Sequence, residues 1–184
     1  MLQHARTSGG GNYRALRPTP YAPASPLADG AAAFMQGVRR KDLATSDWPA
    51  VLGCEIPVDV LAPIEAAIRT EANSIRMRPG FRSAWAALRA RGLKLAVCSN
   101  LAAPYGPPLR AALPDAPDAV ALSYEIGAVK PEPAIYAAVA RMLALPPARI
   151  LFVGDSHTPD SDGPRRIGLQ AMHVTDFERA MSRL

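Results

Sequence analysis

The chain has 184 residues, of which 49% are hydrophobic and 20% are charged, and 21 Lys and Arg against 16 Asp and Glu give it a net charge of +5. This composition is typical of a globular protein with one compact domain and excludes a fibrous or wholly disordered chain. No apolar run approaches the roughly 18 residues of a membrane span, so we expect a cytoplasmic protein without membrane association. The basic residues are spread along the sequence, which argues against nucleic-acid binding.

The first region, residues 1–29, combines a triple glycine at residues 9–11 with four prolines between residues 18 and 26. Such a stretch buries too little apolar surface to offset its ordering entropy. It therefore predicts a flexible N-terminal arm.

The second region, residues 30–78, has a helical period. Leu61, Ile64 and Ile68 recur on one helical face, and Asp59 is placed as a candidate N-cap. We expect a small helical region here.

The third region, residues 79–184, alternates helical patterns with short apolar runs, which predicts a parallel sheet covered by crossover helices. Expected strands lie at 93–98, 119–123, 150–153 and 171–174, and expected helices begin near 81, 133 and 163. The predicted fold is therefore a three-layer, Rossmann-like α/β domain with a small helical cap region.

Polar residues follow these strands where ligands bind in parallel sheets, at the carboxyl ends. They are Ser99 and Asn100 after the first strand, Lys130 before a helix, and Asp155 and Asp160 after the strand 150–153. Each set also has a structural explanation as a cap, a turn or a solvated loop residue. Their location at one end of one sheet instead favours a site where a hydroxyl, an ammonium and a carboxylate-bound Mg²⁺ hold a phosphoryl group.

The same residues resemble the motifs of the haloacid dehalogenase superfamily of phosphatases and related hydrolases. The similar segments are Leu95–Asn100, Val129–Tyr136 and Ile150–Ser156 with Asp160 and Gly163. The resemblance implies that Ser99 and Asn100 bind substrate and that Lys130 steadies both the nucleophile and the transferred group. It implies further that Asp155 binds Mg²⁺ and that Asp160 acts with Lys130 in catalysis.

The superfamily's first motif, a hydrophobic strand ending in Asp-x-Asp that supplies the nucleophile, has no counterpart in the sequence. Asp29 is the nearest approach, but proline precedes it. Losing such a nucleophile lowers activity by on the order of 10⁴ to 10⁶. The resemblance therefore implies a Mg²⁺-dependent phosphatase-type hydrolase with weak or no activity towards a phosphorylated small molecule. The alternative is a non-catalytic protein that binds a phosphorylated ligand or a partner protein.

The missing strand would lie between the strands that carry Ser99 and Asp155, and three arrangements would fill its place. These two strands pair directly, a segment of residues 12–56 inserts, or another chain donates a strand, as in a homodimer. A truncated or frame-shifted gene is a further explanation for the composition of residues 1–28.

Two cysteines, Cys54 and Cys98, are too few for a disulfide framework or a metal–thiolate site, and Cys98 is expected to be a small buried hydrophobic residue. His157 follows the Asp155 segment, where it is either a substrate contact or a surface turn residue.

Overall fold

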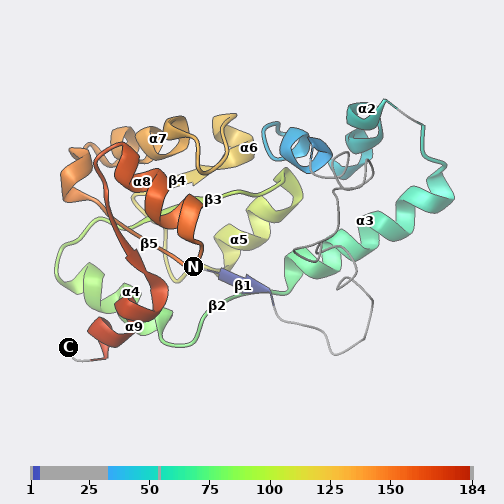
Figure 1. Ribbon diagram of the computed structural model, residues 1–184. Coiled ribbons are helices and arrows are strands. Elements are labelled where there is room, and N and C mark those ends of the chain that lie inside the picture. The colour runs from blue at the N-terminus through green and yellow to red at the C-terminus, as the bar shows by residue number, and fades with distance from the viewer. Residues whose placement is uncertain (1, 5–32, 54, 183–184) are drawn as a thin grey trace, which may run out of the picture.

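The computed structural model describes residues 2–4, 33–53 and 55–182 (Figure 1). Its strands are β1 (Leu2–His4), β2 (Ile75–Met77), β3 (Ala96–Ser99), β4 (Ala119–Leu122), β5 (Leu151–Gly154) and β6 (Gln170–His173). Its α-helices are one over 33–38 and α2 (Trp48–Leu52), α3 (Val58–Asn73), α4 (Phe81–Ala90), α5 (Gly106–Ala112), α6 (Ser123–Ile126), α7 (Pro133–Leu143), α8 (Gly163–Arg166) and α9 (Val174–Met181). Short 3-10 helices are η2 (Thr45–Asp47), η3 (Ala103–Tyr105) and η4 (Pro147–Arg149), and η5 (Thr158–Asp162) is a π-helix. None of the helices in these ranges is both long and apolar enough to cross a bilayer.

Helices cover the strands on both sides, which gives the expected three layers. Figure 1 shows α7 and α8 on one side of β3 and β5, and α4 with α9 on the other. On the first side, Ile135 and Tyr136 of α7 pack with Ala121 and Phe152 in the main core, and all four are buried. On the second side, Phe81 of α4 meets the ring of Phe177 in α9 at 5.6 Å between centroids. The α/β prediction is confirmed.

The strands form three separate pairs. β3 runs parallel to β4, β5 runs parallel to β6, and β1 is antiparallel to β2. Within the described ranges no ladder joins β3 to β5, so direct pairing of these two strands, one of the three arrangements considered for the missing strand, is not found. Each parallel pair instead keeps one edge turned towards the other pair.

Strand positions follow the apolar runs, and their boundaries move by one to three residues. The run 93–98 becomes β3 only from Ala96, because the carboxylate of Asp118 binds the backbone of the residue before it: Leu95 N donates to Asp118 Oδ2 at 2.7 Å. The strand predicted at 150–153 is β5, which extends to Gly154.

The predicted helical region at 30–78 contains α2 and α3, which extend to one side of the sheet layers (Figure 1). Asp59 is not the N-cap of α3; Pro57 takes that position and Asp59 lies within the first turn. There its carboxylate still favours the positive end of the helix dipole. Ile64, one of the residues of the helical period, is 42% exposed.

The predicted N-terminal arm has one ordered element in the described residues. Leu2–His4 form β1, which pairs with β2 through Leu2 and Met77, Gln3 and Arg76, and His4 and Ile75. The remainder of the arm, with Asp29, lies outside the described residues, as does Cys54.

Candidate functional site

The end of β3 is tied to the loop that carries Lys130. The side chain of Asn100 donates from Nδ2 to the Lys130 carbonyl at 3.0 Å, and Lys130 N donates to Asn100 Oδ1 at 2.7 Å. This paired contact spans thirty positions of sequence and fixes the backbone on both sides of Lys130. Asn100 was predicted to bind substrate, and the structure shows that its side-chain amide positions the backbone of Lys130.

Lys130 reaches across to the segment after β5. Its Nζ donates to Asp160 Oδ1 at 2.5 Å, and the two side chains are only 14% and 7% exposed. The other carboxylate oxygen, Oδ2, accepts from Ser156 N at 3.0 Å. Nζ also lies 5.5 Å from the centre of the Phe152 ring. A buried charge of either sign is costly without a partner, so the pair holds both side chains in place.

Gly154 permits this arrangement because a side chain there would occupy the space of Asp160. A Cβ at Gly154 would lie 2.3 Å from both Cβ and Cγ of Asp160. The backbone at the end of β5 thus packs directly against the carboxylate that binds Lys130. The turn itself is closed by Asp160 N, which donates to the carbonyl of Ser156 at 3.0 Å.

Asp155 is the exposed acid of the site, and its Oδ1 accepts from Ser156 Oγ at 3.4 Å. Among the described residues no group of three or more His, Cys, Asp and Glu side chains is arranged to hold a metal ion. Mg²⁺ needs fewer protein ligands, because waters and substrate phosphate complete its shell. One accessible carboxylate beside a hydroxyl fits Mg²⁺ held largely by water and phosphate.

These residues meet at one end of a cleft of about 570 Å³ between β3 and β5. Ser99, Lys130, Asp155 and Asp160 all line it, together with apolar side chains of α4 and α7. The structure therefore brings together the hydroxyl, the ammonium and both carboxylates that the sequence placed at one sheet edge.

A family model for haloacid dehalogenase-like hydrolases matches residues 11–168. This chain belongs to that family. A search of curated protein sequences returned no match. All motif-bearing segments predicted from the sequence lie within the matched range, and only β6 and α9 follow it among the described elements.

Solved structures of the same family share the fold. One is the enzyme bt-2542 from Bacteroides thetaiotaomicron, a mutant in complex with magnesium and inorganic phosphate, at 16% identity and a TM-score of 0.58 over 82% of this chain and 79% of that one. Another is a HAD phosphatase from Thermococcus onnurineus, at 17% identity and a TM-score of 0.55 over 84% and 80%. The L-2-haloacid dehalogenase PA0810 has 17% identity and a TM-score of 0.56 over 94% and 88%. At these identities the likeness shows the haloacid dehalogenase-like fold.

Tyr136 supports the site and was not singled out as a site residue from sequence. It is fully buried, and its hydroxyl donates to the carbonyl of Pro159, one residue before Asp160, at 2.6 Å. It also contacts Gly163 so closely that a Cβ there would lie 2.3 Å from the hydroxyl oxygen. Burial raises the pKa of Tyr136, which keeps the hydroxyl a donor. In the sequence, Tyr136 is the last residue of the motif-like segment Val129–Tyr136, and this position is the signal that could have identified it.

Tyr136→Phe should lower the free energy of unfolding by about 1–2 kcal/mol, because the buried Pro159 carbonyl loses its donor. Urea denaturation measures the change. Tyr105→Phe is the matched control, since the hydroxyl of Tyr105 donates to Glu71 at an exposed position and its loss should cost about 0.5 kcal/mol or less. Equal losses in the two variants would show that Tyr136 does not hold the segment.

A second contact missed from sequence joins the turn after the helix over 33–38 to the loop of Lys130. Arg40 binds both carboxylate oxygens of Glu132, and Glu132 Oε2 also accepts from Val129 N at 3.2 Å. The hydrogen bond from Arg40 holds the pKa of Glu132 below its usual range. Bidentate Arg–carboxylate geometry favours a fixed orientation. The predicted cap region is thereby attached beside the site.

The structure also shows the surroundings of His157 and Cys98, which the sequence analysis named. His157 is 84% exposed and its Nδ1 lies 3.0 Å from Asp162 Oδ2, which agrees with a surface turn residue. Cys98 is partly buried in the cleft wall next to the main core, and this burial raises the pKa of its thiol to about 12. Its reactive thiolate form is therefore rare at neutral pH.

In a Cys54→Ser background, Cys98 should react with iodoacetamide at pH 8 about 10³-fold more slowly than the same thiol in urea, whose pKa returns to about 8.5. Mass spectrometry over time gives both rates. A folded-state rate within about threefold of the unfolded rate would contradict the burial of the thiol.

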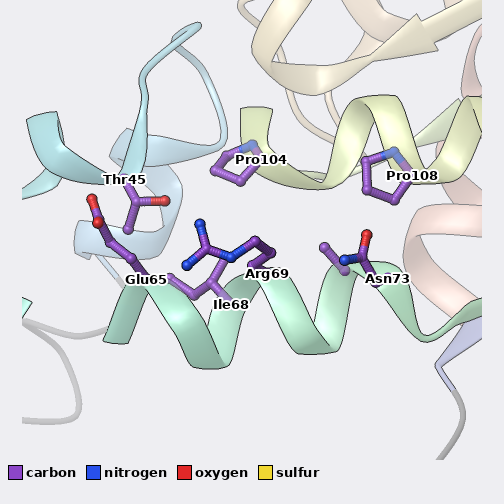
Figure 2. A pocket seen from close by; sticks show the side chains of 8 residues that line it. Thr45, Glu65, Ile68, Arg69, Asn73, Pro104 and Pro108 are labelled. Atoms are coloured by element: carbon purple, nitrogen blue, oxygen red, sulfur yellow. The ribbon is translucent and has the colours of Figure 1, made fainter. Parts of the chain in front are cut away.

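A smaller pocket of about 290 Å³ lies between α3 and the segment of η3 and α5 (Figure 2). Glu65, Arg69 and Asn73, four residues apart on α3, line one side of it, and Pro104 and Pro108 line the other. None of the predicted site residues is among its lining, so the site belongs to the cleft between β3 and β5.

Proposed function

We propose that this chain is a cytoplasmic, Mg²⁺-dependent, phosphatase-type hydrolase that binds a phosphorylated small molecule at the carboxyl ends of β3 and β5 and turns it over weakly. The observation that carries the proposal is the buried pair of Lys130 and Asp160, beside Ser99 and the exposed Asp155. An ammonium held at that point offers a fixed positive charge to an anionic group.

The roles of the side chains follow from their surroundings. Ser99 supplies a hydroxyl donor to a phosphoryl oxygen, and Lys130 supplies charge while Asp160 keeps its Nζ in place. Asp155 would hold Mg²⁺, which when bound neutralises charge on the phosphoryl oxygens. Asn100 fixes the Lys130 backbone and so the direction from which the ammonium approaches.

A second candidate, a non-catalytic protein that binds a phosphorylated ligand, is favoured by the state of the carboxylates. In the described part of the site, Asp160 already accepts from Lys130 and Ser156, and Asp155 is the metal-binding candidate. Neither is then available as a covalent nucleophile. Covalent phosphoryl transfer needs such a group, and this observation is the one that favours the second candidate.

Hydrolysis of para-nitrophenyl phosphate with Mg²⁺, combined with calorimetric titration of inorganic phosphate, separates the two functions. For the hydrolase we expect slow turnover that requires Mg²⁺ and that Asp155→Asn abolishes. For the binding protein we expect no turnover, but phosphate binding that Mg²⁺ strengthens and that Asp155→Asn weakens. Asp162→Asn is the control, because the carboxylate of Asp162 faces His157 in the same segment and does not line the cleft. Absence of both turnover and phosphate binding would contradict both functions.

A further inference from the structure

The loop that carries Lys130, residues 129–132, is a tight turn closed by its own ends. Glu132 N donates to the Val129 carbonyl at 2.8 Å, and Val129 N donates to Glu132 Oε2 at 3.2 Å. The residues before and after the Lys130–Pro131 pair are therefore linked through both backbone and side chain. A displacement of Glu132 is thereby passed to the backbone of Lys130.

This turn is held from the core and also from the predicted cap region. On the core side, Asn100 holds the Lys130 backbone through its two hydrogen bonds. On the other side, Arg40 donates from Nη1 to Glu132 Oε2 at 2.9 Å, and its Nη2 contacts Oε1. Two parallel hydrogen bonds of this kind resist rotation of either side chain. The loop is thus held on both sides of the lysine.

Arg40 extends from a part of the chain that is itself anchored. Val38, two residues earlier, is fully buried. The Arg40 carbonyl lies against Gly127, where an added Cβ would be 4.0 Å from it. At the other end of the contact, Val129 is only 3% exposed. The ion pair therefore joins two fixed segments, so it can restrain the loop between them.

The position of the Lys130 ammonium depends on this restraint because a lysine side chain is a flexible stem. Its Nζ meets Asp160 Oδ1 only while the backbone of the loop stays in place. Molecules in which the loop has moved carry the ammonium away from the anion site. The apparent dissociation constant for an anion rises as the fraction of binding-competent molecules falls.

We propose that Arg40 is a positioning residue for Lys130, which acts by holding Glu132 and so keeps the loop 129–132 in the conformation that places the ammonium beside Asp160. The segment that follows the helix over 33–38 thereby contributes to anion binding without lining the cleft. The consequence for phosphate affinity rests on the proposed function. The consequence for the loop does not.

An effect of charge alone predicts a different result for Glu132→Gln. This variant removes a negative charge two residues from Lys130, and through charge alone that change favours an anion. If the pair positions the loop, the same variant weakens anion binding, because the fork with Arg40 is lost although the glutamine carbonyl still accepts from Val129 N. The sign of the change therefore separates the two effects.

Calorimetric titration of the full chain with inorganic phosphate and Mg²⁺ measures that sign. Arg40→Gln and Glu132→Gln should each weaken phosphate binding about threefold. The double variant should also lose about threefold and not about ninefold, because either change alone removes the shared contact. Urea midpoints confirm that all three variants fold.

Arg110→Gln is the matched control. Arg110 also contacts both oxygens of a glutamate, Glu125, at 2.6 and 2.9 Å. The side chains of that pair are 44% and 34% exposed, against 36% and 38% for Arg40 and Glu132. It joins α5 to α6 and does not touch the loop 129–132 through any of these bonds. Its loss should leave phosphate affinity within about 1.5-fold of the parent.

Amide hydrogen exchange followed by NMR tests the loop in the absence of phosphate. The Lys130 amide, which donates to Asn100, should exchange about fivefold faster in Arg40→Gln and at the parent rate in Arg110→Gln. Amides of β4 should keep the parent rate in both variants, which distinguishes local opening from a loss of overall stability.

Two results would each overturn the proposal: a Lys130 exchange rate in Arg40→Gln within about 1.5-fold of the parent, or tighter phosphate binding by Glu132→Gln. A parent chain that binds no phosphate would contradict the proposed function instead. In that case the exchange rate of the Lys130 amide decides the positioning role by itself.

Discussion

Lys130→Met should lower the free energy of unfolding by about 3–5 kcal/mol, the range observed when one partner of a buried ion pair is removed. The carboxylate of Asp160, with its side chain only 7% exposed, would lose its cationic partner, and among the described residues Ser156 N would remain as its donor, at 3.0 Å. An uncompensated carboxylate in such surroundings is more costly than the pair itself is favourable. Urea denaturation followed by circular dichroism measures the loss.

The double variant Lys130→Met with Asp160→Asn separates charge from packing. Asparagine keeps the shape of the side chain and an acceptor for Ser156 N but carries no charge, so the double variant should recover most of the lost stability. It should not recover phosphate binding, because the ammonium is absent. A double variant as unstable as Lys130→Met alone would show that the lysine stem, and not the ion pair, stabilises this region.

The sequence predicted where the site lies because its information is local. Apolar runs bounded by turn residues mark strands, and the polar residue after each run must lie at a carboxyl end of the sheet. Ser99, Asp155 and Asp160 were found in this way and Lys130 from its place before a helix, and the structure places all four along one cleft. Strand boundaries shifted by a few residues because side-chain contacts such as Asp118 with Leu95 N are not visible in an apolar pattern.

The contacts that hold the site could not be predicted in the same way, because they join residues far apart in sequence. Asn100 was grouped with Ser99 as a substrate contact, but its amide bonds the backbone of Lys130. The hydroxyl of Tyr136 reaches Pro159, and Arg40 reaches Glu132 from the turn after the helix over 33–38. The periodicity of apolar residues does not show which polar atoms come into contact when helices pack on a sheet.

The separation of β3 and β5 could be predicted from the sequence only in part. That a central strand was missing could be inferred from the motif order, but whether the sheet would close depended on packing. Closing the sheet would require α4 and α7 to pack across a narrower sheet. Both helices already have packing contacts: Phe81 of α4 contacts Phe177, and Val139 of α7 lies in the main core. Repacking two helix faces costs more than a few edge hydrogen bonds return, since each contributes about 1 kcal/mol.

Gly154→Ala should lower the free energy of unfolding by about 3 kcal/mol, which is large for the addition of one methyl group. The new Cβ would lie 2.3 Å from Cβ and Cγ of Asp160, so Asp160 or the backbone of β5 must move. Moving Asp160 also breaks its contact with Lys130, which adds the cost of a separated buried pair. Denaturant midpoints measure the stability, and phosphate titration in the folded variant should show weaker binding.

Ser156→Ala is the matched control for Gly154→Ala, because it lies two residues further along the same turn and leaves the backbone N–H that binds Asp160 intact. Its hydroxyl is exposed, so the change should stay within about 0.5 kcal/mol of the parent. The comparison decides between a steric contact at Gly154 and a general sensitivity of the turn. If alanine is tolerated equally well at both positions, then Gly154 does not pack against Asp160, and the position of the Lys130 ammonium must be set by Asn100 instead.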